Sequence, residues 1–504
     1  MTGKTAAVIG TGFSGLCSAI RLKQELNIKV DLFEINTDVA GTWQNNRYLG
    51  AACDIPSHLY SLSFELNPTW TSHYSGQSEI QAYLSHVARK YDLYKKTRFE
   101  TEVIKTEWDD HRKQWLVEWR SVVNHQVTGE GYYDFVFAGL GPLRIPNIPE
   151  EFKGFQGTIV HTTEWDSSID YTNKKLAVIG SGASAIQVIP ELRKVASHVY
   201  SYQRTPAWVV PRDQFTYPRI FKFLLRWVPF LIRFYRNFLF IQHEIYYIIF
   251  GYPNSFLSRR VTSFMKKIFA WRLTRAGRPD LVPVLTPDYS IGCKRIAKSE
   301  NFLEACAKPN VTIIRSGIDQ VKGRTLVDKD GNETEVDILI LATGFDIQGF
   351  TGNLSIRGKD GRSMAEEFSR GFPKTYKSVC ATGYPNFFLL LGPSSGLGHN
   401  SVVTMIECQV EFAIKCIKHM EKKKASAIEP KESAVDEFVG KLKKSFDGTV
   451  WTSGCKSWYM NQEGQPYALW SGTITSYWWA LRKVRGEDFE LHKKDTITQL
   501  PSSL

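Results

Sequence analysis

The stretch AAVIGTGFSG, residues 6–15, decides the fold of this 504-residue chain. A short apolar run ends in a glycine pattern, and an amphipathic segment that reaches Leu26 follows it. This order is typical of a buried parallel strand, a tight turn and a helix. Gly10 permits the turn, Gly12 lets the backbone approach a pyrophosphate, and Gly15 allows close packing of the helix. The stretch therefore predicts a dinucleotide-binding fold with phosphate oxygens at the helix N-terminus.

A second stretch of the same form, LAVIGSGASA, spans residues 176–185. Its Gly180, Gly182 and Ala185 take the places of the three glycines of the first stretch. In both cases another apolar strand pattern follows the helix, which is the order of a βαβ unit. The chain is therefore predicted to be an α/β protein with two Rossmann-like dinucleotide-binding domains.

The residues that end the next strand differ between the two units. Glu34 closes KVDLFE in the first unit, and its carboxylate can accept hydrogen bonds from ribose hydroxyls but would repel a 2′-phosphate. Arg204 and Thr205 close the corresponding strand of the second unit, and a guanidinium can bind a 2′-phosphate through charge-assisted hydrogen bonds. We therefore expect FAD or NAD in the first unit and NADPH in the second.

The net charge of +12 comes from one part of the chain. Residues 201–300 hold 17 Lys or Arg against 5 Asp or Glu. Such a block can attract a phosphorylated cofactor, nucleic acid or an anionic membrane surface. NADP is the simplest partner because the block overlaps the second nucleotide-binding unit, and no nucleic-acid partner is expected. Most of the single charges are expected to lie on solvated helix faces.

The eight cysteines are scattered, with no C-x-x-C pair and no zinc-like spacing. We therefore expect reduced thiols and no metal site. The first predicted strand begins within a few residues of Met1, which leaves no room for a signal peptide. These features predict a cytoplasmic protein, and a monomer is the default assembly.

The segment between the two units is FKGFQGTIVHTTEWD, residues 152–166, with the pattern F-x-G-x-x-x-H-x-x-x-W-D. This long, chemically mixed pattern resembles the fingerprint of the flavin-dependent Baeyer–Villiger monooxygenases. The resemblance implies that His161, Trp165 and Asp166 form a conformational joint between domains that rotate during turnover. Proton transfer by His161 is the alternative, since imidazole titrates near neutral pH.

A second stretch, GTWQNNRYLGAACD at residues 41–54, is similar to another signature of that family. The resemblance places Thr42, Trp43 and Asp54 along the flavin, with Asp54 close to its reacting face. A proline normally follows the aromatic residue in this signature, and Leu49 takes its place here. The alternative role for Asp54 is a helix cap or a loop carboxylate.

A third stretch, TPDYSIGCKR at residues 286–295, resembles a further family motif. The resemblance assigns Lys294 to the NADP phosphate and Arg295 to the reactive edge of the flavin. A fixed guanidinium can stabilise an oxygen anion, and Asp54 could orient it through paired hydrogen bonds. Arg295 and Asp54 are therefore the predicted catalytic residues. A surface basic pair is the alternative for Lys294 and Arg295.

Residues 215–271 are strongly apolar and aromatic. A transmembrane helix needs about 18 or more apolar residues with few charges, and basic residues such as Lys222, Arg226 and Arg233 recur here at helical spacing. We therefore predict an amphipathic helical insert at about 212–285, similar to inserts in the NADP domain of this family, and no transmembrane segment. Peripheral contact with an anionic membrane is the alternative, because interfacial helices combine aromatic and basic faces.

These signals also predict the domain boundaries. The expected parts are a first FAD-binding segment at 1–145, the NADP-binding domain at 146–334, and a second FAD-binding segment with the C-terminal region at 335–504. A glycine-rich loop at 392–400, before a helix that begins near Ser401, is expected to face the flavin with its N–H groups. The charged run at 421–432 is expected to be a solvated surface, and residues 455–482 resemble the family's segment near the substrate.

FAD and NADPH on one chain imply hydride transfer to the flavin. A flavin disulfide reductase would show an early C-x-x-x-x-C pair, which is absent. The resemblance instead implies that reduced flavin reacts with O2 to a C4a-peroxide, which as an anion attacks a ketone to give an ester or lactone. An N- or S-oxidising flavin monooxygenase is the closest alternative, and Trp165–Asp166 with Lys294–Arg295 favour the ketone reaction. A membrane-associated redox-sensing protein that binds the nucleotides without turnover is the third interpretation.

Overall fold

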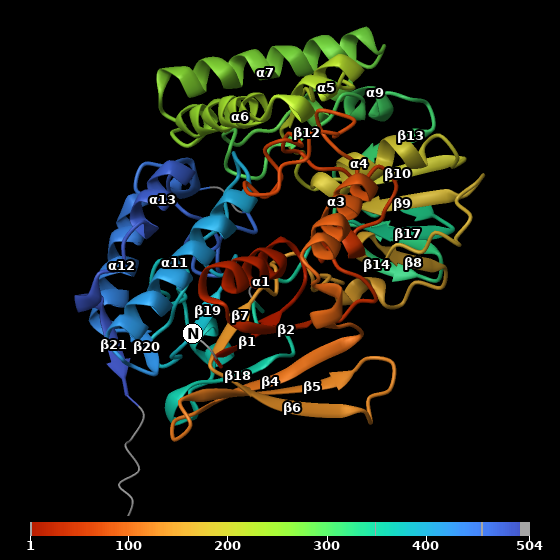
Figure 1. Ribbon diagram of the computed structural model, residues 1–504. Coiled ribbons are helices and arrows are strands. Elements are labelled where there is room, and N and C mark those ends of the chain that lie inside the picture. The colour runs from red at the N-terminus through yellow and green to blue at the C-terminus, as the bar shows by residue number, and fades with distance from the viewer. Residues whose placement is uncertain (1–2, 348, 455–456, 494–504) are drawn as a thin grey trace, which may run out of the picture.

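Two parallel five-stranded sheets form the centre of the molecule. The computed structural model describes residues 3–347, 349–454 and 457–493. The first sheet is covered by helices α1 (Phe13–Leu26) and α11 (Val402–Lys422), and the second lies beside α4 (Ala183–Leu192) on the right of Figure 1. This arrangement confirms the predicted α/β class with two Rossmann-like units.

The first sheet has the strand order β19-β7-β1-β2-β3, and all its pairings are parallel. Its strands are β1 (Thr5–Ile9), β2 (Lys29–Phe33), β3 (Thr97–Arg98), β7 (Phe135–Ala138) and β19 (Phe387–Leu389). The order reverses at β1, which has β2 on one side and β7 on the other. Ligands of open parallel sheets bind at the carboxyl ends of the strands at such a reversal, where the turn with Gly10 lies.

The second sheet repeats this arrangement with the order β13-β10-β9-β17-β8, again all parallel. Its strands are β8 (Thr158–His161), β9 (Lys175–Ile179), β10 (His198–Tyr202), β13 (Val311–Ile314) and β17 (Ile338–Leu341). The order reverses at β9, directly before Gly180. The strand β17 belongs to this sheet although it follows residue 334, where we expected the domain to end. The segment between the two units, residues 152–166, also contributes β8, an edge strand of this sheet.

The helices of the first unit begin where the sequence indicates. Helix α1 starts directly after Gly12, and α3 (Gln77–Lys90) covers the amphipathic segment that follows the second signature. Helix α11 begins after Ser401, whose hydroxyl accepts a hydrogen bond from the N–H of Val403. This N-cap ends the glycine-rich loop at the position we expected.

A four-stranded sheet of order β18-β4-β5-β6 lies below the first sheet in Figure 1; its pairings are antiparallel except for that of β18 with β4, which is parallel. Its strands are β4 (Thr101–Asp109), β5 (Gln114–Ser121), β6 (Thr128–Tyr133) and β18 (Ser355–Arg357). The strands β6 and β7 follow each other closely in the chain but belong to different sheets, β6 to this one and β7 to the first. Asp134 separates them: its carboxylate accepts hydrogen bonds from Lys4 Nζ and the N–H of Thr5, which ties it to the start of β1.

The segment at 212–285 is helical, and it forms a layer at the top of Figure 1. Its helices are α5 (Arg219–Trp227), α6 (Pro229–Phe250), α7 (Phe256–Arg275) and α8 (Leu281–Leu285). No helix in the described part of the chain is long and apolar enough to cross a membrane. Helix α6 contacts both α5 and α7.

The C-terminal part adds helices α12 (Glu432–Ser445) and α13 (Ile474–Leu481) and the antiparallel pair β20 (Ala427–Pro430) and β21 (Phe489–His492). The expectation of a solvated surface at 421–432 is confirmed for Lys422, Lys423, Lys424 and Glu432, which are exposed, and wrong for β20, whose four residues are buried. The remaining short elements are α2 (Thr42–Asn45), α9 (Phe302–Cys306), α10 (Met364–Ser369), β11 (Val209–Val210), β12 (Ala297–Lys298), β14 (Ile318–Lys322), β15 (Thr325–Asp328) and β16 (Glu333–Glu335).

Candidate active site

One cavity of about 1110 Å³ joins the carboxyl ends of the two parallel sheets. Its volume exceeds the roughly 300–1,000 Å³ of a typical small-molecule site, which is consistent with more than one ligand. Twelve of the predicted site residues line it: Gly10, Gly12, Glu34, Thr42, Trp43, Asp54, Gly180, Gly182, Arg204, Thr205, Lys294 and Arg295. Gly15 and Ala185 lie behind the cavity wall in the helices that follow the two turns.

The first glycine turn leaves no room for side chains. Gly10 has a φ of +90°, and a Cβ added to Gly15 would lie 1.8 Å from the carbonyl oxygen of Gly10. Gly12 and Gly41 approach each other so closely that a Cβ at Gly41 would lie 3.1 Å from the Cα of Gly12. The backbone N–H groups at the start of α1 are therefore accessible from the cavity, as a pyrophosphate requires.

Glu34 ends β2 at the cavity wall and is buried. One carboxylate oxygen accepts hydrogen bonds from the N–H and hydroxyl of Thr11, and the other accepts them from the N–H and side-chain amide of Asn36. These four bonds fix the carboxylate at the position expected for a ribose contact. Its negative charge suits a nucleotide that lacks a 2′-phosphate, as FAD does.

The second unit presents positive charge at the corresponding place. Gly180 has a φ of +128°, and a Cβ there would lie 2.3 Å from the carbonyl oxygen of Ala342. Burial lowers the pKa of Lys294, and the charge of Arg204 lowers it further against the opposing effect of Asp288. The two cations thus share one region of the cavity, which fits the phosphate groups of NADPH.

Asp54 and Arg295 form a paired ion contact in the cavity wall. Arg295 donates from Nε to Asp54 Oδ2 at 3.0 Å and from Nη2 to Oδ1 at 2.7 Å. Its third nitrogen, Nη1, donates to the carbonyl oxygen of Leu397 at 3.3 Å. The carboxylate and the guanidinium are 19% and 29% exposed, so the pair is largely removed from water while still facing the cavity.

The charges of this pair reinforce each other. Burial tends to raise the pKa of Asp54, but the charge and hydrogen bonds of Arg295 outweigh it and hold that pKa below its usual range. Asp54 in turn raises the pKa of Arg295, against the effect of burial. Both groups are therefore charged at neutral pH, and the guanidinium is a fixed positive centre rather than a proton donor.

The second signature connects the two nucleotide-binding units. The Tyr48 hydroxyl donates to Gln187 Oε1 of α4 at 2.7 Å, and Gln187 Nε2 donates to the carbonyl oxygen of Ala52 at 2.9 Å. Leu49, which replaces the family proline, is 40% exposed. The turn is made by Gly50, whose φ is +79°. The departure from the signature therefore leaves the neighbouring Asp54 in place.

Trp43 lies in the same wall of the cavity, in the short helix α2 that Thr42 begins. Its indole N–H donates to the Tyr60 hydroxyl at 3.3 Å, and the two rings meet edge to face with centroids 5.9 Å apart. This contact fixes the indole in the cavity wall, where a planar cofactor ring could pack against it.

The three residues of the predicted joint lie outside the cavity lining. His161 ends β8 and is buried; its Nδ1 accepts a hydrogen bond from the N–H of Thr163, and burial lowers its pKa. Trp165 stacks on Tyr171 with ring centroids 5.1 Å apart. Asp166 accepts hydrogen bonds from the N–H and hydroxyl of Ser168. These contacts fix the segment against the second sheet; the joint itself stays a prediction.

Two residues of the site were missed at the level of sequence. Lys329 lies close to Arg204, because the aliphatic parts of both side chains come within about 4 Å of the Cβ position of Gly317. Both residues line the cavity, so Lys329 adds a third cation to the predicted phosphate region. Tyr459 is the second residue, since it lies close enough to Arg295 for the guanidinium charge to affect its pKa. Burial raises that pKa to about 12, and the charge of Arg295 opposes the rise. Neither belongs to a local motif, and Tyr459 could be anticipated only from its position in the C-terminal segment.

The cysteines differ from expectation at one position. Cys293, the neighbour of Lys294, is disulfide-bonded, so the expectation of reduced thiols throughout is wrong. No short-range cysteine motif marks it, because folding can bring together cysteines that are distant in sequence. The free cysteines of the described structure are buried, and burial raises the pKa of Cys53, beside Asp54, to about 12. Cys53 is therefore a thiol at neutral pH and no nucleophile.

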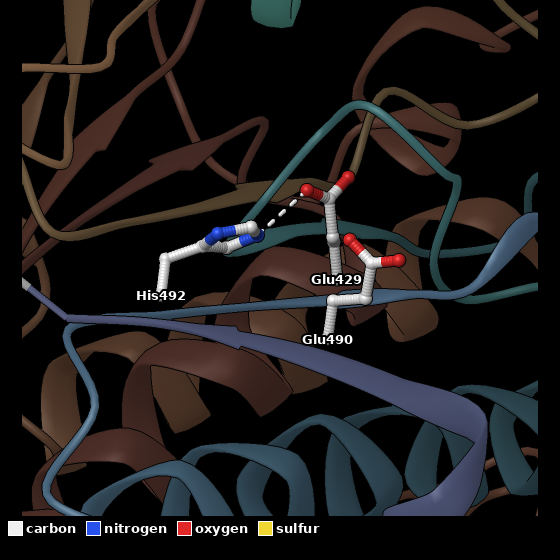
Figure 2. A group of neighbouring side chains, drawn as sticks. All are labelled: Glu429, Glu490 and His492. Atoms are coloured by element: carbon white, nitrogen blue, oxygen red, sulfur yellow. Dashed lines mark hydrogen bonds and ion pairs between the residues drawn. The ribbon is translucent and has the colours of Figure 1, made fainter.

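Glu429 of β20 and Glu490 and His492 of β21 lie next to one another (Figure 2), and none of them lines the cavity. Glu429 accepts hydrogen bonds from His492 Nε2, Lys359 Nζ and the N–H of Gly383. The Lys359 ammonium already balances the charge of the buried Glu429 carboxylate. These contacts therefore stabilise the pairing of β20 and β21 and do not indicate a metal site.

The two glycine turns lead to a matched pair of variants. Gly15→Ala is expected to destabilise the protein by about 3 kcal/mol or more, because the new methyl group would overlap the Gly10 carbonyl. Gly182→Ala is expected to change stability by less than about 1 kcal/mol, because nothing lies within 4 Å of its Cβ position. Its methyl group would instead weaken NADPH binding by about tenfold. Thermal unfolding and NADPH titration of both variants check this, and equal loss of stability would contradict it.

Comparison with known proteins agrees with this geometry. The family model for flavin-binding monooxygenase-like proteins matches residues 3–241. A Baeyer–Villiger monooxygenase of Pseudomonas aeruginosa is 37% identical over 92% of this chain and 87% of its own length. A Baeyer–Villiger monooxygenase of Streptomyces coelicolor is 36% identical over 96% of this chain and 92% of its own length.

Solved structures give the same result. Cyclohexanone monooxygenase from Rhodococcus sp. Phi1 bound to NADP+ has a TM-score of 0.85 and 26% identity, over 97% of this chain and 99% of that one. An oxidised steroid monooxygenase bound to NADP has a TM-score of 0.84 and 26% identity, over 97% of this chain and all of that one. These relationships agree with the two glycine turns of the site, with the opposite charges of Glu34 and Arg204, and with the Asp54–Arg295 pair. The chain therefore belongs to the FAD- and NADPH-dependent Baeyer–Villiger monooxygenases.

Proposed function

We propose that this protein inserts one oxygen atom of O2 beside the carbonyl of a small-molecule ketone, giving an ester or lactone. The observation that carries the proposal is the Asp54–Arg295 pair, which faces the cavity that both glycine turns share. The names of the relatives support the same reaction class. Reduction by NADPH in the second unit supplies the electrons.

Residues of both units would hold the cofactors. Backbone N–H groups after Gly10, with Glu34 at the ribose, fit the dinucleotide of FAD, and Gly180 with Arg204 and Lys294 fits NADPH. FAD, once bound and reduced, supplies activation of O2 for oxygen transfer. The protein contributes binding, orientation and charge.

Arg295 is the proposed anion-stabilising group. Because all three nitrogens have hydrogen-bond acceptors, its position is set before a substrate enters. A preorganised positive charge is most effective where negative charge develops in a transition state, here on the carbonyl oxygen of the ketone. Asp54 is proposed to orient the guanidinium, and neither group is assigned a proton transfer.

Three supporting assignments are part of this proposal. Thr42 and Trp43 are proposed to contact the flavin, and Thr205 the NADPH, since all three line the cavity. The segment from His161 to Asp166 is proposed to act as a joint between the two units, because it joins them in the chain and lies outside the cavity. We also propose that the second unit ends after Leu341, so that it includes β17.

The products of a mixed substrate panel test the reaction. Purified protein is incubated with NADPH, air and linear ketones, cyclic ketones, a thioether and an amine. We expect esters or lactones, because the fixed charge of Arg295 favours attack on a carbonyl. Sulfoxide or N-oxide without ester would assign the protein to N- or S-oxidation, and NADPH binding without any product would favour a nucleotide-binding role. The same panel defines which ketones are accepted.

A further inference from the structure

The helices α5, α6 and α7 expose an unusual amount of apolar surface. More than half of the large hydrophobic side chains that the described structure exposes lie between Phe215 and Trp271. Among them, Phe230, Phe234 and Trp227 are each at least 65% exposed. Soluble monomers rarely expose contiguous apolar patches beyond a few hundred Å², so such a surface indicates an interaction site.

Helix α6 is apolar on two opposite sides. One side packs on the protein and is buried, with Ile232, Leu239 and Tyr247 among its contacts. The other side is exposed and repeats at intervals of three and four residues: Phe230, Phe234, Phe238, Ile241, Ile245 and Ile248. At 1.5 Å per residue, this exposed stripe is about 27 Å long. The inner side accounts for the fold, whereas the outer stripe has no described partner.

Helix α7 exposes a stripe in which aromatic and basic residues alternate. Its members, at intervals of three and four residues, are Phe256, Arg260, Phe264, Lys267, Trp271 and Arg275. The Arg260 guanidinium lies 4.9 Å from the Phe256 ring centroid, and that of Arg275 lies 5.4 Å from the Trp271 centroid. Aromatic and basic side chains mixed in this way are typical of helices at a membrane interface, where rings enter the headgroup region and cations contact lipid phosphates.

The charge of these helices has one sign. Glu244 is the single acidic residue between positions 214 and 275, and its carboxylate accepts hydrogen bonds from Asn400 and from the N–H groups of Ile474 and Thr475. Nine basic residues of the three helices form no described ion pair: Arg219, Lys222, Arg226, Arg233, Arg259, Arg260, Lys266, Lys267 and Arg275. The surface is thus apolar and positively charged.

We propose that the outer side of α5, α6 and α7, here called the insert face, docks onto the interface of an anionic lipid bilayer. Burial of the exposed aromatic and aliphatic side chains supplies the apolar contribution, and the nine cations supply attraction to anionic headgroups. Since no described helix can span a bilayer, the helices lie on the membrane. A second copy of the chain is a poorer partner, because two positively charged faces would meet.

The insert face lies one helix away from the active-site cavity. Glu244 and the carbonyl of Phe240, on the inner side of α6, accept hydrogen bonds from Asn400, which lines the cavity. A helix with its side chains is about 10–12 Å across. Docking would therefore bring the cavity wall close to the lipid surface without closing it.

Vesicle sedimentation tests the proposal with the full-length protein loaded with FAD. Vesicles of phosphatidylcholine alone are compared with vesicles that also contain phosphatidylglycerol. We expect binding to the anionic vesicles, weakened but not abolished by added salt, because screening removes the ionic part and leaves apolar burial. The double variant Phe234→Ser/Phe238→Ser should bind at least about tenfold more weakly. Arg260→Glu/Lys267→Glu should lose the preference for anionic vesicles.

The matched control is Val123→Ser/Val127→Ser, which removes two comparably exposed apolar side chains at the turn between β5 and β6. It should bind like the unaltered protein. Absence of binding to anionic vesicles, or equal loss in the control, would overturn the proposal. Sedimentation equilibrium without vesicles detects the competing outcome: a dimer that Phe234→Ser/Phe238→Ser dissociates would assign the face to self-association. None of these measurements depends on catalytic turnover. The membrane proposal can therefore fail or succeed independently of the proposed reaction, which the product analysis tests.

Discussion

Replacing Arg295 by alanine is expected to lower the rate of ester formation by about a hundredfold to a thousandfold, the usual cost of losing one preorganised group that stabilises an anion. The variant should still bind FAD, because the proposed dinucleotide contacts come from Gly10, Gly12 and Glu34. Product analysis and the flavin absorbance of the purified variant measure the two effects. Unchanged ester yield would show that another group stabilises the anion.

Arg272→Ala is the matched control for this prediction. Arg272 also donates two hydrogen bonds to one carboxylate, that of Glu304, and it is largely buried, but it lies outside the cavity. Its loss should lower stability without lowering the rate per bound flavin. If both variants lose activity equally, the effect of Arg295→Ala reflects lost structure rather than chemistry.

Arg204→Ala is expected to raise the KM for NADPH by about tenfold to a hundredfold, and the KM for NADH far less. The reason is that a hydrogen bond to a charged group contributes roughly 1.5–3 kcal/mol, and only NADPH carries the 2′-phosphate. Steady-state kinetics with both cofactors measures the ratio. Equal changes for the two cofactors would contradict the assignment of Arg204.

Lys194→Ala serves as the control for Arg204. Lys194 lies at the end of α4 in the same unit, is exposed, and pairs with Glu191 away from the cavity. Both variants lose one positive charge, so a general effect of net charge on cofactor attraction would appear in both. A specific contact with the 2′-phosphate would appear in Arg204→Ala alone.

The parts of the fold that sequence could predict are those with local causes. Gly10 and Gly180 adopt φ values of +90° and +128°, which only glycine tolerates readily, so both turns are visible as patterns. The difference between Glu34 in the first unit and Arg204 in the second is equally local, because each residue ends the strand that follows the glycine turn of its own unit. The residue types at the ends of these two strands therefore predict which unit accepts a 2′-phosphate.

Other features depend on contacts between distant segments. Lys329 comes near Arg204 only because it follows β15 and its N–H donates to the carbonyl oxygen of Gly317, next to which the Arg204 side chain lies, and no motif surrounds it. The run at 421–432 appeared solvated because it is charged, yet Glu429 is buried with Lys359 and His492 as partners. A charged residue is expected outside unless it is paired, and such partners cannot be found from one sequence.

Helix α6 shows a further limit of sequence. Its apolar residues recur on two sides, and periodicity does not say which side packs on the protein. The structure assigns Leu239 and Tyr247 to the inner side and Phe234 and Ile241 to the outer one. The prediction of a helical insert was therefore possible, whereas the position of its exposed stripe was not.

The bond between Asp54 and Arg295 spans 241 positions of the chain, one partner following the first glycine turn and the other the second. Neither unit contains the complete proposed reaction centre by itself. Removing either partner leaves a largely buried charge without its counter-ion, which commonly costs about 3–5 kcal/mol. The proposed reaction centre and part of the contact between the two units thus depend on the same two hydrogen bonds, so a chain that is incompletely folded is also one that cannot hold the guanidinium in place.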